Sequence, residues 1–361
     1  MTQVATFAVE HSAYLDADGK ALQPLPEALA QPDTLRALYR WMTLARAFDA
    51  KAIELQRTGR LGTYASCLGQ EAAGVGVGYA MQPEDVLLPS FREQAVQLVR
   101  GVTATELLLY WGGDERGSDF HGPRQDFPIS ITVGGHAPHA AGVALAFKLR
   151  AEARVAVCAI GDGATSKGDL YEAMNVAGAW QLPLVFVVNN NQWAISMPRA
   201  EQSAARTLAQ KAIAAGFTGE QVDGNDVVAV TDVVGKAIAH ARAGGGPRLV
   251  ECLTYRLSDH TTVDDASRYR SDEEVSRHWH EDPLKRLRLW LEREHGWSAE
   301  DDDACRAECE ASITAAADAY LATPPQAPES LFDYLYETLP DDLRAQRDAL
   351  LAEPRDEHGH G

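Results

Sequence analysis

The chain has 361 residues, of which 45% are hydrophobic and 24% charged, and this length and composition predict two domains or one large α/β domain with extensions. Its formal net charge of −19 argues against nucleic acid and anionic membranes as partners, and no segment approaches the roughly 18 consecutive apolar residues that span a bilayer. Because the acidic N-terminal segment is typical neither of a secretory signal nor of an organelle transit peptide, we expect a cytoplasmic protein.

The first hundred residues combine an irregular arm with helices and one short strand. Residues 1–32 contain prolines but no periodicity, which predicts an extended N-terminal arm. From Asp33 to residue 55, apolar residues recur in steps of three and four, which predicts an amphipathic helix with Asp33 as its N-cap. Further elements are expected as a helix that opens at 69–73, a strand at 85–89 and a helix that ends near residue 99.

The middle of the chain has the pattern of a parallel sheet. After a polar loop at 113–128, continuous apolar runs at 154–160, 184–188 and 249–254 predict strands that are buried on both faces. Further elements are expected as helices at 139–149, 167–180, 204–215 and 227–242, and as a short strand at Val222. Strands that alternate with helices of this length predict an α/β fold with a parallel sheet and helices on both of its faces.

The last third of the chain is mostly helical. The segment 255–271 is polar and aperiodic, and the periodic segments that follow it are 283–293, 300–321, 331–339 and 343–351. Cys305 and Cys309 lie one helical turn apart without further ligand residues, which favours two ordinary helix residues over a zinc site. We therefore divide the chain into an extended arm (1–32), an α/β domain (33–280) and a C-terminal helical extension (281–361).

Two turns that follow neighbouring strands carry the residues with the clearest chemistry. Gly161-Asp162-Gly163 comes directly after the first buried strand and Asn191 after the second, so both turns are expected at the carboxyl edge of the sheet, where ligands bind. Carboxylate, amide and backbone carbonyl oxygens suit Mg²⁺, and diphosphate oxygens would complete its coordination. Glycines let the backbone approach a phosphate, and a helix that begins at Ala164 would favour an anion at its N-terminus. Gly-Asp-Gly is also a common tight turn, but its spacing from Asn191 favours a binding site.

Residues 161–196 resemble the thiamine diphosphate motif along their whole length. The chain contains neither a P-loop nor the glycine fingerprint of a dinucleotide-binding fold. From about residue 33 to 353, it resembles the alpha subunit of the thiamine-dependent first component of 2-oxo acid dehydrogenase complexes, in the α2β2 class. The other segments that carry the resemblance are GQEA at 69–72, PSFRE at 89–93, PHAAGVALA at 138–146, QVDGNDVVAV at 221–230 and TYRLSDHTTVDDASRYRS at 254–271.

The resemblance implies thiamine diphosphate and Mg²⁺ as cofactors. The positions that correspond to the family's Mg²⁺ ligands are Asp162, Asn191 and the backbone carbonyl of Trp193. The positions that correspond to its diphosphate contacts are Arg92, Gly161, Gly163 and Ala164.

The resemblance also assigns the residues around the reactive part of the cofactor. Phe91 corresponds to an aromatic residue against the aminopyrimidine, and Val133 to the aliphatic residue under the bent cofactor. His260 corresponds to the active-site histidine, which also contacts the cofactor. With an ordinary pKa of about 6.5, such a histidine can donate a proton near neutrality.

The chain departs from the family at several of these positions. Phe91 replaces a tyrosine and loses its hydroxyl donor, Asn189 stands where some members have a phosphate-binding arginine, and Asp259 stands where relatives often have histidine or glycine. Thr261 and Ser271 occupy the positions of the phosphorylated serines of regulated members, which leaves control by phosphorylation open.

The activity that the resemblance implies is the oxidative decarboxylation of a 2-oxo acid and the reductive acylation of the lipoyl group of the next component. A glutamate that this reaction needs belongs to the family's beta subunit, so the expected assembly is an α2β2 heterotetramer. Its further partners would be the lipoyl domain and core acyltransferase of the complex. We expect a pyruvate dehydrogenase of the acetyl-transferring type; a branched-chain (3-methyl-2-oxobutanoate) or an acetoin dehydrogenase alpha subunit is the alternative. A non-catalytic alpha-like scaffold is an alternative of a different class, and the retention of Asp162, Asn191, Arg92 and His260 argues against it.

Overall fold

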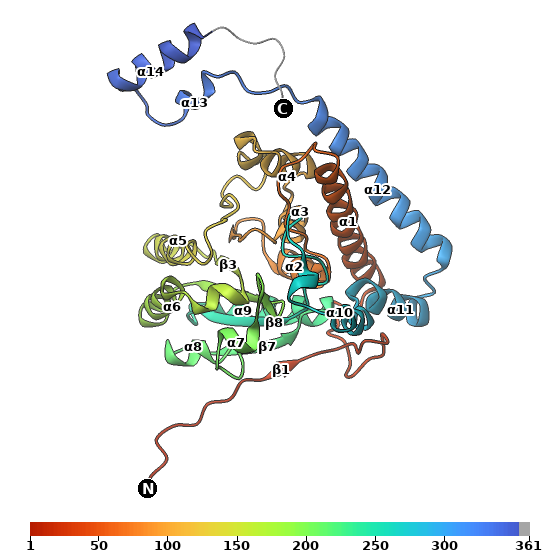
Figure 1. Cartoon of the computed structure of the whole chain (residues 1–361). Helices are drawn as coiled ribbons and strands as arrows, with labels where there is room; N and C mark the ends of the chain where they lie inside the picture. The colour runs from red at the N-terminus through yellow and green to blue at the C-terminus, as the bar shows by residue number, and fades with distance from the viewer. Residues whose placement is uncertain (354–361) are drawn as a thin grey trace. The chain divides into compact units, whose positions relative to one another are not determined.

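In the computed structural model, residues 1–353 are described (Figure 1). They form two compact units, one from Met1 to Tyr320 and one that begins at Leu321. Residues 354–361, which belong to the predicted helical extension, lie outside the described part of the chain. Between residues 1 and 353, no helix is both long enough and apolar enough to cross a membrane. The predicted domain boundaries after residues 32 and 280 stay predictions.

A six-stranded parallel sheet forms the centre of the first unit, in the order β1-β7-β8-β4-β3-β2. The strands are β1 His11–Ser12, β2 Val86–Leu88, β3 Ala156–Gly161, β4 Leu184–Asn190, β7 Gly219–Asp223 and β8 Arg248–Leu253. Gly161 of β3 is in register with Asn189 of β4, so the turns that follow these two strands meet at one edge of the sheet. The predicted α/β fold with a parallel sheet is confirmed.

Helices cover both faces of the sheet, because successive side chains of a strand point to opposite faces. Cys158 and Phe186 pack on one face against α5 (Ala137–Leu149) and α6 (Gly168–Trp180). Val157 and Val185 pack on the other face against α2 (Glu71–Ala80) and α9 (Val227–Arg242). α2 approaches α9 closely at Gly76, where a Cβ atom would lie 2.6 Å from the side chain of Val230.

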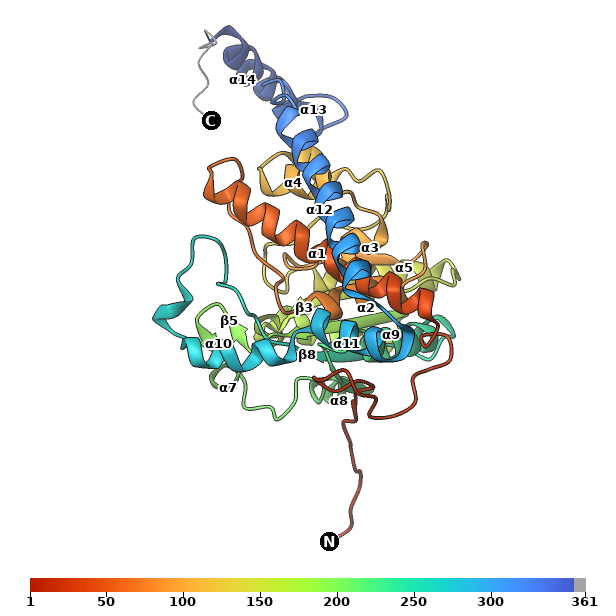
Figure 2. The ribbon, with the colours of Figure 1, turned by 90° about the vertical axis from the view of Figure 1, so that its right-hand side faces the viewer.

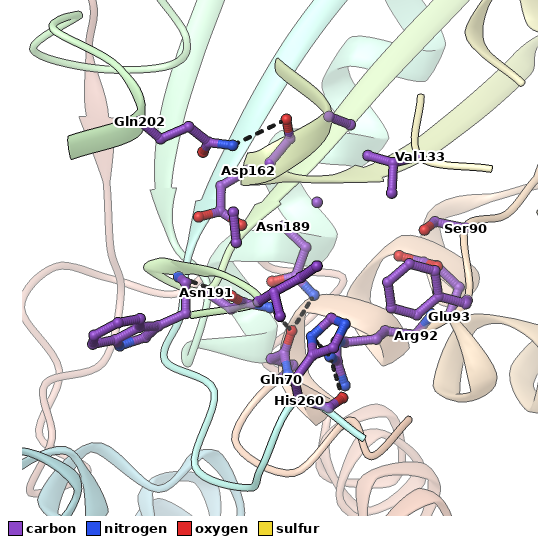
Figure 3. A pocket seen from close by; sticks show the side chains of 17 residues that line it. Gln70, Ser90, Arg92, Glu93, Val133, Asp162, Asn189, Asn191, Gln202 and His260 are labelled. Carbon is purple, nitrogen blue, oxygen red and sulfur yellow. Dashed lines mark hydrogen bonds between the residues drawn. The ribbon is translucent and has the colours of Figure 1, made fainter. Parts of the chain in front are cut away.

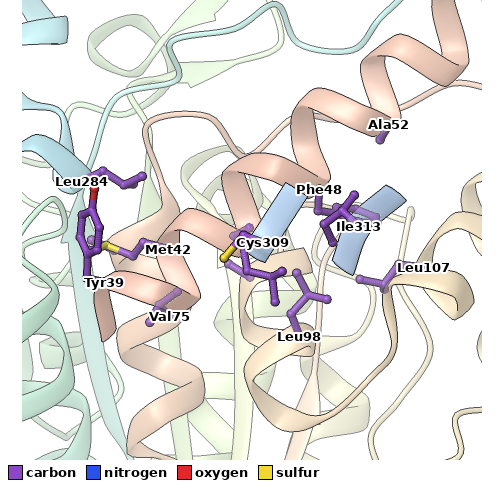
Figure 4. Close-up of a cluster of buried hydrophobic side chains, with 14 of the residues drawn as sticks. Tyr39, Met42, Phe48, Ala52, Val75, Leu98, Leu107, Leu284, Cys309 and Ile313 are labelled. Atoms are coloured by element: carbon purple, nitrogen blue, oxygen red, sulfur yellow. The ribbon is translucent and has the colours of Figure 1, made fainter. Parts of the chain in front are cut away.

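Several further helices pack with α2 around another apolar core, which lies apart from the two layers on the sheet and is shown in Figure 4. Its helices are α1 (Pro32–Arg57), α3 (Gln94–Arg100), α4 (Ala104–Trp111), α11 (Pro283–His295) and α12 (Ala299–Ala322). Phe48 of α1, Leu107 of α4 and Ile313 of α12 are all buried in this core. In Figure 2, α1 and α11 lie side by side, in agreement with their many contacts. All five cysteines are buried and form no disulfide bonds, including Cys305 and Cys309 of α12.

Shorter elements complete the chain. They are the hairpin β5 Trp193–Ala194 and β6 Met197–Pro198, and the helices α7 Arg199–Gln202, α8 Lys211–Ala214, α10 Asp272–His278, α13 Ser330–Asp333 and α14 Asp341–Ala352. The N-terminal arm packs on the body of the first unit at Tyr14 and Leu15, whose backbone N–H groups both donate to Asp226 at 2.7 Å. The extended arm is therefore ordered by contacts with the loop before α9.

Two of the predicted helix starts are wrong. Helix α1 begins at Pro32 after Gln31, so Asp33 lies inside the first turn and is not its N-cap. Proline is favoured at the first helical position because the N–H that it lacks would have no intrahelical partner. The segment after β3 is a 3-10 helix, Asp162–Ser166, and α6 begins only at Gly168, so no α-helix starts at Ala164.

The helix predicted at 204–215 is reduced to one turn, Lys211–Ala214. The buried carboxylate of Glu251 on β8 accepts hydrogen bonds from the backbone N–H groups of Leu208 and Ala209, at 2.8 and 3.0 Å. These bonds satisfy donors that a longer helix would have used, and they stabilise a loop.

The structure also contains α4, which the periodicity did not predict. Thr103 accepts a hydrogen bond from the backbone of Glu106, whose side chain accepts one from the backbone of Thr103. This capping box was visible as a Thr-x-x-Glu pattern before an apolar run, and it would have located the helix.

Candidate active site

A cleft opens at the carboxyl ends of β3 and β4 and is lined by the 17 residues drawn in Figure 3. The residues assigned from the sequence all line it: Phe91, Arg92, Val133, Gly161, Asp162, Gly163, Ala164, Asn191, Trp193 and His260. The residues that the sequence did not assign are Gln70, Ser90, Glu93, Asn189, Ala194, Ile195 and Gln202. The structure thus brings together positions that lie far apart in the chain.

Asp162 has the properties of a ligand residue whose partner is a bound group. Its side chain is 2% exposed, and its Oδ2 has no hydrogen-bond partner among the described residues. Burial raises the pKa of Asp162 to about 6, although nearby backbone N–H groups and the cations Arg256 and Arg92 oppose the shift. A buried polar atom without a partner requires an explanation, and a cation at Oδ2 provides one.

The turn after β4 places Asn191 and Trp193 near this carboxylate. Asn191 is buried, and its Oδ1 accepts a hydrogen bond from the backbone N–H of Trp193 at 3.2 Å. Two residues beside Trp193 have left-handed backbones, Gln192 at φ 72° and Ile195 at φ 57°. For a β-branched residue such as Ile195 this conformation is strained, and strain of this kind concentrates at functional sites. The strained backbone therefore marks this turn as a candidate part of the site.

The Gly161–Ala164 segment leaves room for a ligand beside the backbone. A Cβ atom added at Gly161 would meet no other atom within 4 Å, and so would project into the cleft that Gly161 lines. The carbonyl of Gly163 accepts a hydrogen bond from Gln202 Nε2 at 3.2 Å, which ties this turn to α7. These features suit backbone contact with a diphosphate, whereas the expected α-helix N-terminus at Ala164 is absent from this turn.

Arg92 lies at the opposite side of the cleft and contacts His260. Its Nη1 donates to the carbonyl of Ser66 at 2.7 Å, and its Nη2 lies 2.9 Å from His260 Nδ1 and 2.6 Å from the carbonyl of His260. Burial and the neighbouring Arg256 lower the pKa of Arg92 to about 10, so it remains a cation at neutral pH. An anionic ligand in the cleft would therefore meet a buried positive charge.

The surroundings of His260 determine its protonation state. Arg256 Nη1 lies 3.3 Å from His260 Nδ1, so two guanidinium groups face the same ring nitrogen. Guanidinium groups only donate, so Nδ1 accepts and the proton of the neutral ring is on Nε2. Burial first, and then Arg92 and Arg256, lower the pKa of His260 to about 4, against a smaller opposing effect of Asp264. This pKa lies below the ordinary value of about 6.5, because the side chain is partly buried and contacts two buried arginines, Arg92 and Arg256.

The loop around His260 is held by side-chain hydrogen bonds. Asp264 accepts from the backbone N–H of His260 at 2.9 Å and from the hydroxyl of Tyr269. Arg256 is fully buried, and its Nη2 donates to Tyr269 at 2.8 Å and to the carbonyl of Ile195 at 2.9 Å. The loop is thereby linked to the turn that carries Trp193.

Apolar side chains form the remaining wall of the cleft. The ring of Phe91 meets the imidazole of His260 edge to face, with centroids 5.9 Å apart and an interplanar angle of 85°. Val133 and Ile195 line the cleft but are 43% and 57% exposed in the single chain. The cleft therefore has an apolar rim that the isolated chain leaves open to solvent.

Two of the polar cleft residues that were not assigned from the sequence, Gln70 and Glu93, contact residues that were assigned. Gln70 accepts hydrogen bonds from both Asn189 and Asn191. Glu93 accepts from the backbone N–H of Arg92 at 3.0 Å, and burial raises the pKa of Glu93 to about 7. Gln70 and Glu93 belong to two segments that carried the resemblance, GQEA and PSFRE. A polar residue inside such a segment was the signal that could have marked each of them as a site residue.

Comparisons with known proteins show the family to which the chain is similar. The family model described as Dehydrogenase E1 component matches residues 39–329. The chain is 42% identical over 321 residues to a 3-methyl-2-oxobutanoate dehydrogenase subunit alpha of Mycobacterium tuberculosis, covering 89% of this chain and 88% of that protein. It is 38% identical over 332 residues to a pyruvate dehydrogenase E1 component subunit alpha of Mycoplasma genitalium, covering 92% and 93%. A protein of the same name from Staphylococcus aureus is 40% identical over 306 residues, covering 84% and 83%.

Proposed function

The chain belongs to the dehydrogenase E1 component family, and on this premise we propose that it is the alpha subunit of a pyruvate dehydrogenase of the acetyl-transferring type. It is an oxidoreductase of the 2-oxo acid dehydrogenase class, whose family depends on thiamine diphosphate. The observation that carries the assignment of the site is the orphaned Oδ2 of Asp162, in one cleft with Asn191, Arg92 and His260. A branched-chain substrate is the second candidate, since the relative at 42% identity is named for 3-methyl-2-oxobutanoate.

The residues of the cleft fit the cofactor and a cation. Asp162, Asn191 and the carbonyl of Trp193 would hold Mg²⁺. The residues proposed to receive the diphosphate are Arg92, Gly161, Gly163 and Ala164, and those against its rings are Phe91, Val133 and His260. When bound, thiamine diphosphate supplies the carbanion and the electron sink that decarboxylation of a 2-oxo acid requires.

His260 would act mainly as a hydrogen-bond donor through Nε2. Because Nδ1 faces Arg92 and Arg256, Nε2–H is the group available to an oxygen of the substrate. A bound diphosphate beside Arg92 would offset the positive charge that lowers the pKa of His260. With the cofactor bound, His260 would then be a stronger base, able to carry the proton needed at the lipoyl group.

The proposed assembly is an α2β2 heterotetramer that receives the lipoyl domain of the core acyltransferase. The exposed apolar rim of the cleft, which includes Val133 and Ile195, supports a site that another chain completes. The beta subunit would cover this rim and supply the glutamate that activates the cofactor.

Co-expression with a beta subunit tests the proposal. We expect the complex to release CO₂ from pyruvate faster than from 3-methyl-2-oxobutanoate, with no turnover of acetoin. The alpha chain alone should be inactive, and turnover by it alone would contradict the shared site. Faster turnover of the branched-chain substrate would select the second candidate. A complex that bound thiamine diphosphate with Mg²⁺ but turned over none of the three substrates would contradict the assigned activity. A complex that bound no cofactor would favour a non-catalytic scaffold.

A further inference from the structure

The two asparagines at the end of β4 share one buried partner, Gln70. Gln70 Oε1 accepts from Asn191 Nδ2 at 2.9 Å and from Asn189 Nδ2 at 3.1 Å, as the dashed lines in Figure 3 show. The side chain of Gln70 is 2% exposed, and its Nε2 is buried without a partner among the described residues. One carbonyl oxygen thus determines the orientation of two amides.

This arrangement decides which atom of Asn191 faces the cleft. With Nδ2 held by Gln70, the Oδ1 of Asn191 points to the other side, where it accepts from the backbone of Trp193. An amide in the reverse orientation would present Nδ2, a donor that cannot bind a cation. Asn189 is held in a matching way, since its Oδ1 accepts from the hydroxyl of Thr254 at 2.7 Å.

The backbone on either side of Gln70 is closely packed. Gly69 has φ 85°, and a Cβ atom there would lie 2.5 Å from the carbonyl of Tyr255, so this turn requires glycine. The next residue, Glu71, is fully buried and pairs with Arg46 at 2.8 Å. These contacts fix the place of Gln70 beside the two asparagines.

We infer that Gln70 is a positioning residue for the cation site, which orients Asn191 so that Oδ1 faces Mg²⁺ beside Asp162. The inference rests on the proposed function. It also explains why an uncharged residue occupies position 70. A carboxylate there would accept the same two hydrogen bonds but would bring a second negative charge next to the cofactor's phosphates. Gln70 also leaves one donor, Nε2–H, for a bound acceptor in the cleft.

The test compares Mg²⁺ dependence in variants of the α/β complex. Gln70→Met keeps the length and volume of the side chain but removes the acceptor. Binding of thiamine diphosphate is followed by tryptophan fluorescence as Mg²⁺ is varied. We expect the half-saturating Mg²⁺ concentration for cofactor binding to rise about tenfold in Gln70→Met. Gln97→Met is the matched control, because Gln97 is equally buried but does not line the cleft.

A second pair of variants keeps the inference testable if Gln70→Met does not fold. Gln70→Asn retains the amide but is one methylene too short to reach both asparagines, so it should also raise the Mg²⁺ requirement. Thr254→Val removes the donor to Asn189 but leaves the hydrogen bond between Gln70 and Asn191. It should change the half-saturating Mg²⁺ concentration by less than threefold. An unchanged Mg²⁺ requirement in the foldable Gln70 variant, or an equal change in Gln97→Met, would overturn the inference. A parent complex that binds no thiamine diphosphate with Mg²⁺ would instead overturn the proposed function.

Discussion

The cleft joins two regions that are built in different ways. The cation region consists of the strand ends with Asp162, Asn191 and Trp193, and its positions follow from the register of β3 and β4. The histidine region consists of Arg92, Arg256 and His260, in which side-chain contacts join Arg92 to a loop residue 168 positions away and Arg256 to the same residue four positions away. Backbone pairing therefore determines where the side chains of the first region lie. In the second region, the pKa values depend on which charged side chains are in contact. The two regions should respond differently to mutation.

The largest expected effect comes from Asp162→Asn, which changes the cation region alone. An amide is a much weaker ligand for Mg²⁺ than a carboxylate, so Mg²⁺-dependent cofactor binding by the α/β complex should fall by about 100-fold or more. The melting temperature without cofactor should not fall, because the change removes a buried charge. Fluorescence titration and thermal melting measure the two effects, and a binding constant within threefold of the parent would be the contrary result.

His260→Ala is the reciprocal change in the histidine region. Loss of a positioned donor typically costs about 100-fold or more in rate, so kcat should fall by that amount while cofactor binding stays within about threefold. Steady-state kinetics on the complex, with the same fluorescence titration, separates these quantities. If binding fell as far as kcat, the two regions would not be independent. His260→Asn, which keeps a donor, should recover part of the rate.

Arg256→Gln tests whether charge controls the pKa of His260 in the histidine region. Since a cation disfavours the imidazolium, its removal should raise the pKa of His260 from about 4 toward its ordinary value. In the parent, the unfolded state binds this proton at about 6.5 and the folded state only at about 4, so this residue's contribution to stability is complete above pH 6.5 and is lost as the pH falls toward 4. In Arg256→Gln the loss should be smaller.

NMR titration of the imidazole and denaturation at several pH values measure both effects of Arg256→Gln. The exposed Arg268 of the same loop is the control, and Arg268→Gln should leave the pKa of His260 unchanged. An unaltered pKa in Arg256→Gln would show that burial and Arg92, without Arg256, account for the lowered pKa of His260.

The smallest expected effect comes from Phe91→Tyr. The edge-to-face contact with His260 uses the ring, which both residues provide, so kcat/KM should change by no more than about threefold. Steady-state kinetics measures it, and a larger gain would show that a hydroxyl at this position contributes a hydrogen bond to the reaction.

Several features followed from sequence patterns because they depend on nearby residues. The buried strands β3, β4 and β8 and the helix α9 are encoded by local hydrophobic periodicity, and α9 spans the predicted residues 227–242. The capping box of α4 was equally local and was overlooked. By contrast, the segment at 204–215 has helical periodicity but forms a loop, because Glu251 on a distant strand binds its backbone.

By itself, the sequence determined the parallel α/β fold and the position of the Gly161–Ala164 and Asn191 turns at two adjacent strand ends, since both depend on chain order and hydrophobic pattern. Only the tertiary structure decided the lowered pKa of His260, the orphaned oxygen of Asp162 and the contacts of Gln70 with two asparagines. These properties arise from burial and from side chains brought together across more than a hundred residues, such as Gln70 with Asn189 and Asn191. Desolvation and the direction of a hydrogen bond depend on the groups in contact, which residue order alone does not specify.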